Sequence, residues 1–280
     1  DDCCPVSTGK IVAESVDDPR LEVIFHERNT GVGGAVVTGI RKALADEMEI
    51  CVKLDSDGQM DPSLIPALIY PIWNHEADYV KGNRFYSLES VQEMPKIRIF
   101  GNAVLSLMNK VSSGYWSVTD PTNGFVAADS RVLKHINLQK LRTGWFFESD
   151  LLFRLAILRA KVMELPMSSF YGEEKSNLHP HKVVAEFLGR HLVNTVKRIF
   201  YNYYLREWNS VSLELPAAGL FLLVSLLNLL DLSGLSSLTL GVSQDANLFM
   251  AFTGAIISVQ LFLAALTQDV ANEPRETVSA

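Results

Sequence analysis

The most restrictive feature of this sequence is a pair of uncharged apolar runs in its C-terminal third. Residues 215–230 carry no charge, and residues 246–268 carry none over 23 residues. As a helix, the second run is about 34 Å long, enough to cross the hydrocarbon core of a bilayer. The alternative is a pair of buried core helices, although core helices rarely stay uncharged over such a length. We expect a two-helix transmembrane hairpin with a short cytosolic tail over residues 211–280.

The placement of basic residues orients this hairpin. Residues 175–210 contain six Lys and Arg against two Glu, whereas residues 231–245 contain neither Lys nor Arg. Because cytosolic flanks are the basic ones, the asymmetry predicts a multi-pass membrane protein whose N-terminal portion faces the cytosol. Apolar residues recur at helical spacing over 184–203, which predicts a basic amphipathic helix lying on the membrane within 175–210. A helix packed on its own domain is the alternative.

Overall composition narrows the possible partners. The formal net charge is −7, so the chain lacks the basic excess that binding to nucleic acid phosphates requires. Its three cysteines show no zinc-ligand spacing and are too few to build a disulfide scaffold of this size. We therefore expect no nucleic acid partner, and free thiols in a reducing compartment.

The first 174 residues alternate short apolar strands with helices. Strands are predicted at 21–26, 49–54 and 77–82, and helices at 33–46 and 62–75. Such alternation is typical of an α/β domain with a mainly parallel sheet and helices on both faces. Ligands of these sheets bind beyond the carboxyl ends of the strands. The residues that follow each predicted strand are therefore the candidates for a site.

An acidic motif follows the second predicted strand. It reads Asp55-Ser-Asp57-Gly-Gln59 and places two carboxylates two residues apart. Oxygen ligands of this kind suit a hard divalent cation such as Mg²⁺ or Mn²⁺, which in turn binds diphosphates. The alternative is an acidic turn that caps the next helix.

A glycine-rich segment follows the first predicted strand. Residues 29–35 read Asn-Thr-Gly-Val-Gly-Gly-Ala, and such a turn before a helix brings backbone amides close to phosphates. A dinucleotide-binding fingerprint is disfavoured because Val36 stands where its third glycine is needed.

Together these motifs resemble those of the family 2 glycosyltransferases of GT-A fold. The pattern is most similar to the polyprenyl-phosphate sugar synthases of the dolichol-phosphate mannose synthase type. Three further segments agree: 120–125 (DPTNGF), 147–150 (FESD) and 171–176 (YGEEKS). The resemblance covers about residues 1–210, and the basic helix and the hairpin also fit it. In that family's fold Asp1-Asp2 would end the second strand, so we expect a first strand and its loop upstream of residue 1.

The resemblance implies a set of site residues. These are Asp1, Asp2, Asn29, Gly31, Gly34, Asp55 and Asp57 for donor binding, Asp57 and Gln59 for the metal, Arg84, Arg98 and Asn102 for phosphates, Lys175 and Ser176 on the acceptor side, and Asp120 and Glu148 as catalytic carboxylates. For the arginines, a solvated or salt-bridged surface role is the alternative. For the two carboxylates, the alternative is a helix cap or a core carboxylate satisfied by hydrogen bonds.

The resemblance also implies an activity. The expected protein is an inverting, metal-dependent glycosyltransferase that moves one sugar from a nucleotide-sugar donor to a membrane polyprenyl phosphate. No Q-x-x-R-W motif follows residue 150, which favours transfer of one sugar over polymerisation. Transfer to a saccharide or glycolipid hydroxyl, with Glu148 or Asp120 as base, is the second possibility. A third is an inactive, membrane-tethered partner subunit.

Overall fold

The computed structural model describes residues 1–86, 96–167, 180–232 and 243–278. Its strands are β1 (Ile50–Lys53), β2 (Tyr79–Asn83), β3 (Val126–Asp129) and β4 (Val162–Pro166). Its helices are α1 (Thr8–Ser15), α2 (Val32–Ala45), α3 (Ile65–Trp73), α5 (Lys96–Ser113), α6 (Ser130–His135), α7 (Phe147–Leu158), α8 (Pro180–Phe200), α9 (Ser210–Leu232) and α10 (Gln244–Ala271), with short 3₁₀ turns η1 (Pro62–Leu64) and η2 (Leu138–Lys140) and the π-helical η3 (Tyr201–Arg206).

The four described strands form one mixed sheet in the order β1-β3-β2-β4. Only β2 and β4 pair in parallel, because β3 runs antiparallel to both of its neighbours. β1, β2 and β4 therefore run in one direction, as expected for a mainly parallel sheet, and among the described strands β3 is reversed. The physical reason is the segment that precedes β3. It is held at the carboxyl ends of β1 and β2, where Lys53 Nζ donates to the Gly124 carbonyl oxygen at 3.2 Å. A strand that enters the sheet from that edge runs against both neighbours.

Residues 21–26, predicted as the first strand, form no strand in the structure. The segment makes two backbone bonds with the start of the chain. The Asp1 amine donates to the Ile24 carbonyl at 2.8 Å, and the His26 N–H donates to the Asp1 carbonyl at 2.9 Å. Two bonds to a single residue are too few for a regular ladder. The predicted strands at 49–54 and 77–82, and both predicted helices, are confirmed as β1, β2, α2 and η1–α3.

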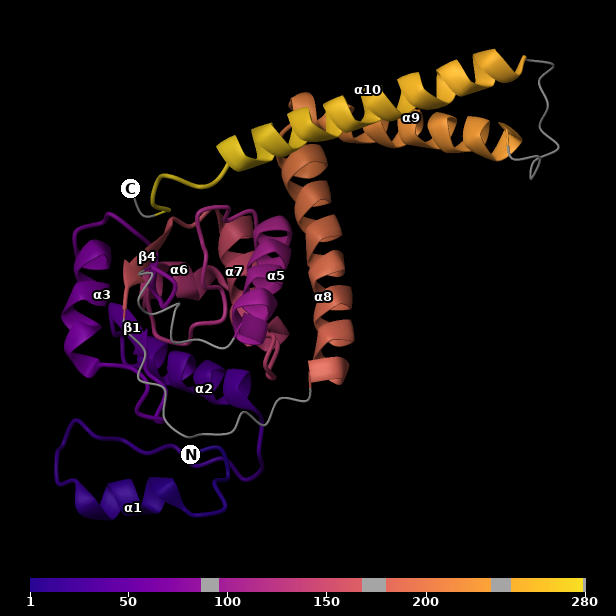
Figure 1. The fold of residues 1–280 in the computed structure, drawn as a ribbon. Helices are drawn as coiled ribbons and strands as arrows, with labels where there is room; N and C mark the ends of the chain where they lie inside the picture. Colours follow the sequence, from indigo (N-terminus) through magenta and orange to yellow (C-terminus); the bar gives the residue numbers. More distant parts are fainter. Residues whose placement is uncertain (87–95, 168–179, 233–242, 279–280) are drawn as a thin grey trace. The chain divides into compact units, whose positions relative to one another are not determined.

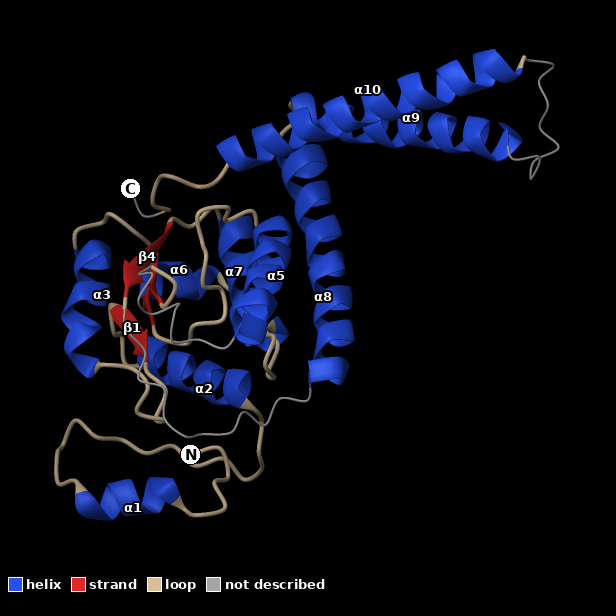
Figure 2. Cartoon of the chain, viewed as in Figure 1, coloured by secondary structure: helices blue, strands red, loops and turns tan. Residues whose placement is uncertain are grey.

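Each face of the sheet is covered by its own apolar layer, as predicted for an α/β domain. On one face, residues of α2, α6 and α7 pack against Tyr79, Val126 and Ala128. On the other face, Leu68 and Ile72 of α3 pack against Val80 and Ala127. Figure 2 shows α3 on one side of the strands and α7 on the other. The strand ends between these layers carry the polar residues of the site.

The chain divides into two compact units, Asp1–Val196 with Pro274–Ala280, and Lys197–Glu273. In the second unit α9 and α10 pack side by side (Figure 1). Ser225 Oγ donates to the Ala251 carbonyl at 2.7 Å, and Ser258 Oγ donates to the Ala218 carbonyl at 2.9 Å. Helices Ser210–Leu230 and Gln244–Ala271, with mean hydropathy of 1.9 and 2.0, are long and apolar enough to cross a membrane.

Helix α8 buries Phe187 and several polar side chains, and it exposes a row of apolar ones. His191 and Asn194 are buried, and the His191 Nδ1 lies 2.7 Å from Ser112 Oγ. Leu188, Leu192 and Val196, spaced four residues apart, are 58%, 63% and 60% exposed. The apolar periodicity of this segment therefore marks the outer face of the helix. A helix that packs only on its own domain shows the reverse arrangement.

Candidate active site

Charged side chains from separate parts of the chain gather where β1 and β2 end. Lys53 is the last residue of β1, and Lys81 lies in β2. The acidic partners come from the segment after β1, from the loop that precedes β3, from the first turn of α7 and from β4. These residues therefore lie beyond the carboxyl ends of strands, where a ligand site is expected.

Lys53 is the centre of the first half of this cluster. Its Nζ lies 2.7 Å from Asp55 Oδ1 and 3.7 Å from Glu148 Oε1, and the side chain is 11% exposed. It also donates to the Gly124 carbonyl oxygen at 3.2 Å. Any Cβ at Gly124 would overlap with Lys53 Nζ and Asp55 Oδ2, so glycine is required for this close approach. The D-x-D motif and the DPTNGF segment are thus in direct contact.

Glu148 faces this lysine from the first turn of α7. Burial raises the pKa of its carboxyl, while the nearby Lys53 and Lys81 ammonium groups oppose the rise. Phe147, which is 1% exposed, anchors the helix start in the core and so fixes the position of Glu148. Asp150, the other acid of the FESD segment, lies elsewhere. It accepts hydrogen bonds from the Arg142 N–H at 3.2 Å and from Arg154 Nε at 3.0 Å.

Asp120 and Arg84, predicted to have separate roles, form one ion pair. Arg84 Nε donates to Asp120 Oδ2 at 2.7 Å, and an Arg84 NH2 group donates to Oδ1 at 2.8 Å. The Asp120 side chain is 0% exposed, and that of Arg84 is 15% exposed. A fully buried carboxylate held by both oxygens is a poor proton acceptor. Between the two predicted catalytic carboxylates, Glu148 is therefore the more accessible.

Sequence reasoning missed Glu164 of β4, which fixes the segment before Asp120. Its Oε1 accepts from the backbone N–H groups of Thr119 and Asp120, at 2.9 and 2.8 Å. Its Oε2 accepts from Thr119 Oγ1 at 2.7 Å and from Asn83 Nδ2 at 2.8 Å. The available signal was a lone acid in an otherwise apolar run, since an ionised residue in a strand interior needs partners.

Lys81, also missed, is a fully buried lysine in β2. Its Nζ donates to the Asn123 carbonyl at 3.2 Å, and burial lowers its pKa to about 8 despite the opposing charges of Asp120, Glu164 and Glu148. Asn123 in turn donates from Nδ2 to the Gly82 carbonyl at 2.8 Å. Both lysines thus bind successive carbonyls of the DPTNGF segment.

The remaining residues of the acidic motif lie closer to solvent. Asp57 is exposed, and its Oδ1 accepts from the Gln59 N–H at 3.0 Å. Asp55 is turned toward Lys53, so Asp57 presents the more open carboxylate. Within the described ranges, no group of three or more His, Cys, Asp or Glu side chains converges on a point. Asp57 and Gln59 therefore supply oxygen ligands of the right chemistry for a hard cation, but not a closed metal site.

Asp2 organises the predicted donor-binding loop. Its carboxylate accepts from the N–H groups of Thr30 and Gly31, both at 2.8 Å, and its carbonyl accepts from Asn29 Nδ2 at 3.1 Å. Although burial opposes the shift, hydrogen bonds from His26, Thr30 and Gly31 lower the pKa of Asp2 to about 2. Asp1 instead bonds the Cys4 and Gly9 N–H groups, both at 2.7 Å. The structure thus places Asp2, Asn29 and Gly31 together.

The glycines of this loop allow close packing at the start of α2. The Gly33 N–H donates to the Thr143 carbonyl at 2.8 Å. A Cβ at Gly31, whose φ is +82°, would lie 2.6 Å from the same carbonyl oxygen, and one at Gly34 would overlap with Thr30 Oγ1. The glycine pattern therefore has a structural reason beside the predicted contact with the donor.

The last predicted residues lie on α5 or outside the described ranges. Arg98 and Asn102 both belong to α5, one turn apart, and Asn102 is half-buried. Lys175 and Ser176 lie outside the described residues.

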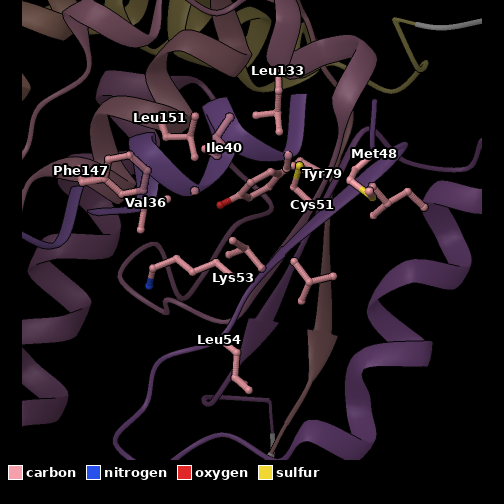
Figure 3. A pocket seen from close by; sticks show the side chains of 16 residues that line it. Val36, Ile40, Met48, Cys51, Lys53, Leu54, Tyr79, Leu133, Phe147 and Leu151 are labelled. Atoms are coloured by element: carbon pink, nitrogen blue, oxygen red, sulfur yellow. The ribbon is translucent and has the colours of Figure 1, made fainter. Parts of the chain in front are cut away.

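An apolar pocket of about 370 Å³ lies beside the charged cluster. It is lined by α2, by β1 and the following Leu54, and by Phe147 and Leu151 of α7. Lys53 is the one charged residue of its lining, and Figure 3 shows its amine pointing away from the apolar side chains. Lys53 therefore stands at the boundary between apolar core and polar site.

Known proteins resemble parts of this chain. A UDP-N-acetylglucosamine–dolichyl-phosphate N-acetylglucosaminyltransferase from Methanococcus voltae is 34% identical over 154 residues, which cover 55% of this chain and 61% of that protein. An undecaprenyl-phosphate mannosyltransferase from Micrococcus luteus is 28% identical over 199 residues, which cover 70% of this chain and 79% of that protein. The chain thus spans about three fifths of the length of the Methanococcus relative.

Among solved structures, glucosyl-3-phosphoglycerate synthase from Mycobacterium tuberculosis gives a TM-score of 0.43 at 18% identity, covering 64% of this chain and 57% of that chain. At the level of families, residues 1–136 match the family described as Glycosyl transferase family 2. The glycine-rich loop, the acidic motif and the DPTNGF segment all lie within that match. Residues 1–136 of this chain therefore contain a match to glycosyl transferase family 2.

Proposed function

We propose that the protein is an inverting glycosyltransferase that moves a single sugar from a nucleotide-sugar donor to a membrane polyprenyl phosphate, dolichyl or undecaprenyl. The observation that carries the proposal is the contact of Lys53, Asp55, Glu148 and Gly124 in a family 2 domain. The named activities of the Methanococcus and Micrococcus relatives support the acceptor class.

The proposed reaction forms a bond between an acceptor phosphate oxygen and the anomeric carbon, and breaks the bond from that carbon to the donor diphosphate. The acceptor oxygen is already anionic, so a strong general base is unnecessary. We assign Glu148 to orienting the acceptor. We assign Asp120 to holding Arg84. The Arg84 Nε lies 2.7 Å from Asp120 Oδ2, so the pair fixes the position of the guanidinium charge at the site.

Donor binding is assigned to Asp2, Asn29, Gly31, Gly34, Asp55 and Asp57, with Asp1 supporting the loop. A divalent cation, Mg²⁺ or Mn²⁺, would be held by Asp57 and Gln59 together with the donor diphosphate, and would neutralise charge on the leaving group. Arg98 and Asn102 of α5 are proposed for phosphate binding, and Lys175 and Ser176 for the acceptor side.

Membrane anchoring completes the proposal. We assign a catalytic part up to 174, an interfacial part at 175–210 and a hairpin at 211–280, and we propose that the catalytic part faces the cytosol. Two helices long and apolar enough to cross a bilayer support the hairpin, and the exposed apolar face of α8 supports contact with lipid. The absence of Lys and Arg between residues 231 and 245 supports the cytosolic orientation.

A second candidate is transfer to a saccharide or glycolipid hydroxyl. Glu148 favours it, because burial raises the pKa of this carboxyl toward the range of a general base. On that reading Glu148→Gln would abolish transfer, whereas with a phosphate acceptor it would reduce transfer only partly.

The test is transfer of radiolabel from a panel of nucleotide sugars, in membranes that contain the full chain. We expect label in an organic-extractable, mild-acid-labile product, and loss of that label with EDTA or with Asp57→Asn. The matched control is Asp46→Asn, which removes a carboxylate at the surface ion pair with Lys42. Full turnover in chelator would refute the metal assignment, and label only in an acid-stable product would refute the phosphate acceptor.

A further inference from the structure

Two lysines flank the first residue of β3. In the sheet register, Val126 pairs with Lys53 of β1 on one side and with Lys81 of β2 on the other. Paired residues of neighbouring strands point to the same face, so both ammonium groups rise on the face covered by α7. Lys81 binds the Asn123 carbonyl and Lys53 the Gly124 carbonyl, each at 3.2 Å.

Lys53 forms ion pairs with two carboxylates. Its Nζ is 2.7 Å from Asp55 Oδ1 and 3.7 Å from Glu148 Oε1. Asp55 follows β1 directly, whereas Glu148 comes from the first turn of α7, so one ammonium joins two distant parts of the chain. The Lys53 and Glu148 side chains are 11% and 15% exposed, so little water screens their charges, whereas Asp55 at 36% lies closer to solvent.

We propose that Lys53 is a positioning residue of the glycosyltransferase site, the shared counterion that keeps the Asp55 and Glu148 carboxylates side by side. The proposal rests on the proposed function and adds a residue to it. Without the ammonium, two carboxylates would face each other in a partly buried site, and one would move away or take up a proton. Because Lys53 also binds Gly124, its loss would loosen the DPTNGF segment at the same time.

The charged surroundings identify Glu148 as the group that would respond. The groups that face it are Lys53 and Lys81 from the sheet, Asp55 after β1, and the buried Tyr79 phenol. Of these, Lys53 has the largest effect in favour of the ionised carboxylate, while Asp55 and burial act against it. Removing Lys53 therefore leaves burial and Asp55 to favour a protonated Glu148.

The first experiment is a double-mutant cycle on thermal unfolding of the full chain in detergent, with Lys53→Met, Glu148→Gln and the double variant. It needs no ligand. At pH 7.5 we expect Lys53→Met to lower the unfolding temperature by about 5 °C or more. Glu148→Gln in that background should restore part of the loss, and so should lowering the pH to about 5. Strict additivity of the two substitutions would overturn the shared-counterion role.

The second experiment measures transfer with whichever donor the panel identifies. We expect Lys53→Met to lower kcat by about tenfold or more at pH 7.5 and to move the acid limb of the kcat/KM profile to higher pH. Lys53→Arg should recover part of kcat, since it keeps the charge but changes the geometry. The matched control is Lys42→Met, which removes a lysine from a surface ion pair with Glu22 and Asp46.

The two experiments separate the failure of each idea. The wild-type chain could transfer no sugar from any donor while the unfolding cycle shows coupling between Lys53 and Glu148. That result would support the counterion role and refute the proposed activity. Sugar transfer with a wild-type kcat and pH profile in Lys53→Met would overturn the positioning role while leaving the activity in place.

Discussion

The buried carboxylate of Asp120 is stabilised by an ion pair. The side chain is 0% exposed and is held at both oxygens by Arg84. We predict that Arg84→Met destabilises the fold by about 3–5 kcal/mol, because it leaves an unpaired buried carboxylate. Chemical unfolding of the full chain in detergent measures this loss.

The control for this prediction is Arg20→Met, since the Arg20 side chain is 89% exposed in its pair with Asp18. It should leave the free energy of unfolding close to that of wild type, because exposed ion pairs contribute little. An Arg84→Met variant with wild-type stability and only a raised KM for the donor would instead support the original assignment of Arg84 to phosphate binding alone.

Glu148 makes stability depend on pH in a defined direction. Burial raises its pKa above the ordinary 4.5, so the folded chain holds this proton more tightly than the unfolded chain. Stability from this group therefore increases as the pH falls through the folded pKa toward 4.5, and decreases as the pH rises. We predict that wild type gains stability relative to Glu148→Gln between about pH 7 and pH 5. Unfolding at several pH values gives the difference, and a difference independent of pH would contradict the prediction.

At the scale of elements, the start of α2 depends on glycine where its middle does not. A Cβ at Gly33 would overlap with the Arg142 carbonyl oxygen and lie 2.9 Å from Phe147 Cβ, whereas nothing lies within 4 Å of one at Gly39. We predict that Gly33→Ala destabilises the fold by about 1–3 kcal/mol. Gly39→Ala, the matched control in the same helix, should stabilise it by about 0.5–1 kcal/mol. Unfolding free energies of the two variants test both predictions. Equal effects would show that the close contact of Gly33 with Arg142 and Phe147 does not contribute to stability.

The elements that sequence predicted correctly are those specified by local patterns. β1, β2, α2 and α3 follow from apolar runs and turn residues over a few positions each. The direction of β3 depends instead on where the preceding segment is held, by Lys53, Lys81 and Glu164, and these partners are far away in sequence. Residues 21–26 have the composition of a strand, but a strand also needs a neighbour with which to pair, and composition does not report one.

The candidate site follows the same division. Asp55, Asp57, Asp120 and Glu148 stand in short motifs and were found from them. Lys53 and Glu164 were missed because a single charge within a strand resembles a solvent-facing residue until its partner is known. The pairing of Arg84 with Asp120 joins positions 36 residues apart and likewise requires the fold.

At the scale of the whole molecule, the proposed topology predicts which residues face the outside of the cell. In a variant whose three native cysteines are replaced by serine, we introduce Gln244→Cys at the start of α10 or Glu276→Cys beyond its end; both positions are exposed. Gln244→Cys should react with an impermeant maleimide added to intact cells, because residues 231–245 carry no Lys or Arg. Glu276→Cys should react only after permeabilisation. The reverse pattern would invert the orientation, and reaction of both in intact cells would rule out a cytosolic tail.

The serine hydrogen bonds between α9 and α10 have a consequence for the insertion of the proposed hairpin into the membrane. Ser225 and Ser258 each donate to a carbonyl of the opposite helix, and Gly254 lets the backbones approach, since a Cβ there would lie 3.0 Å from the Phe221 carbonyl oxygen. A helix that enters the bilayer before its partner lacks these contacts and must satisfy its hydroxyls within its own turns. During biogenesis we therefore expect α9 to be retained at the insertion machinery until α10 emerges from the ribosome, and the two helices to enter the lipid as one unit.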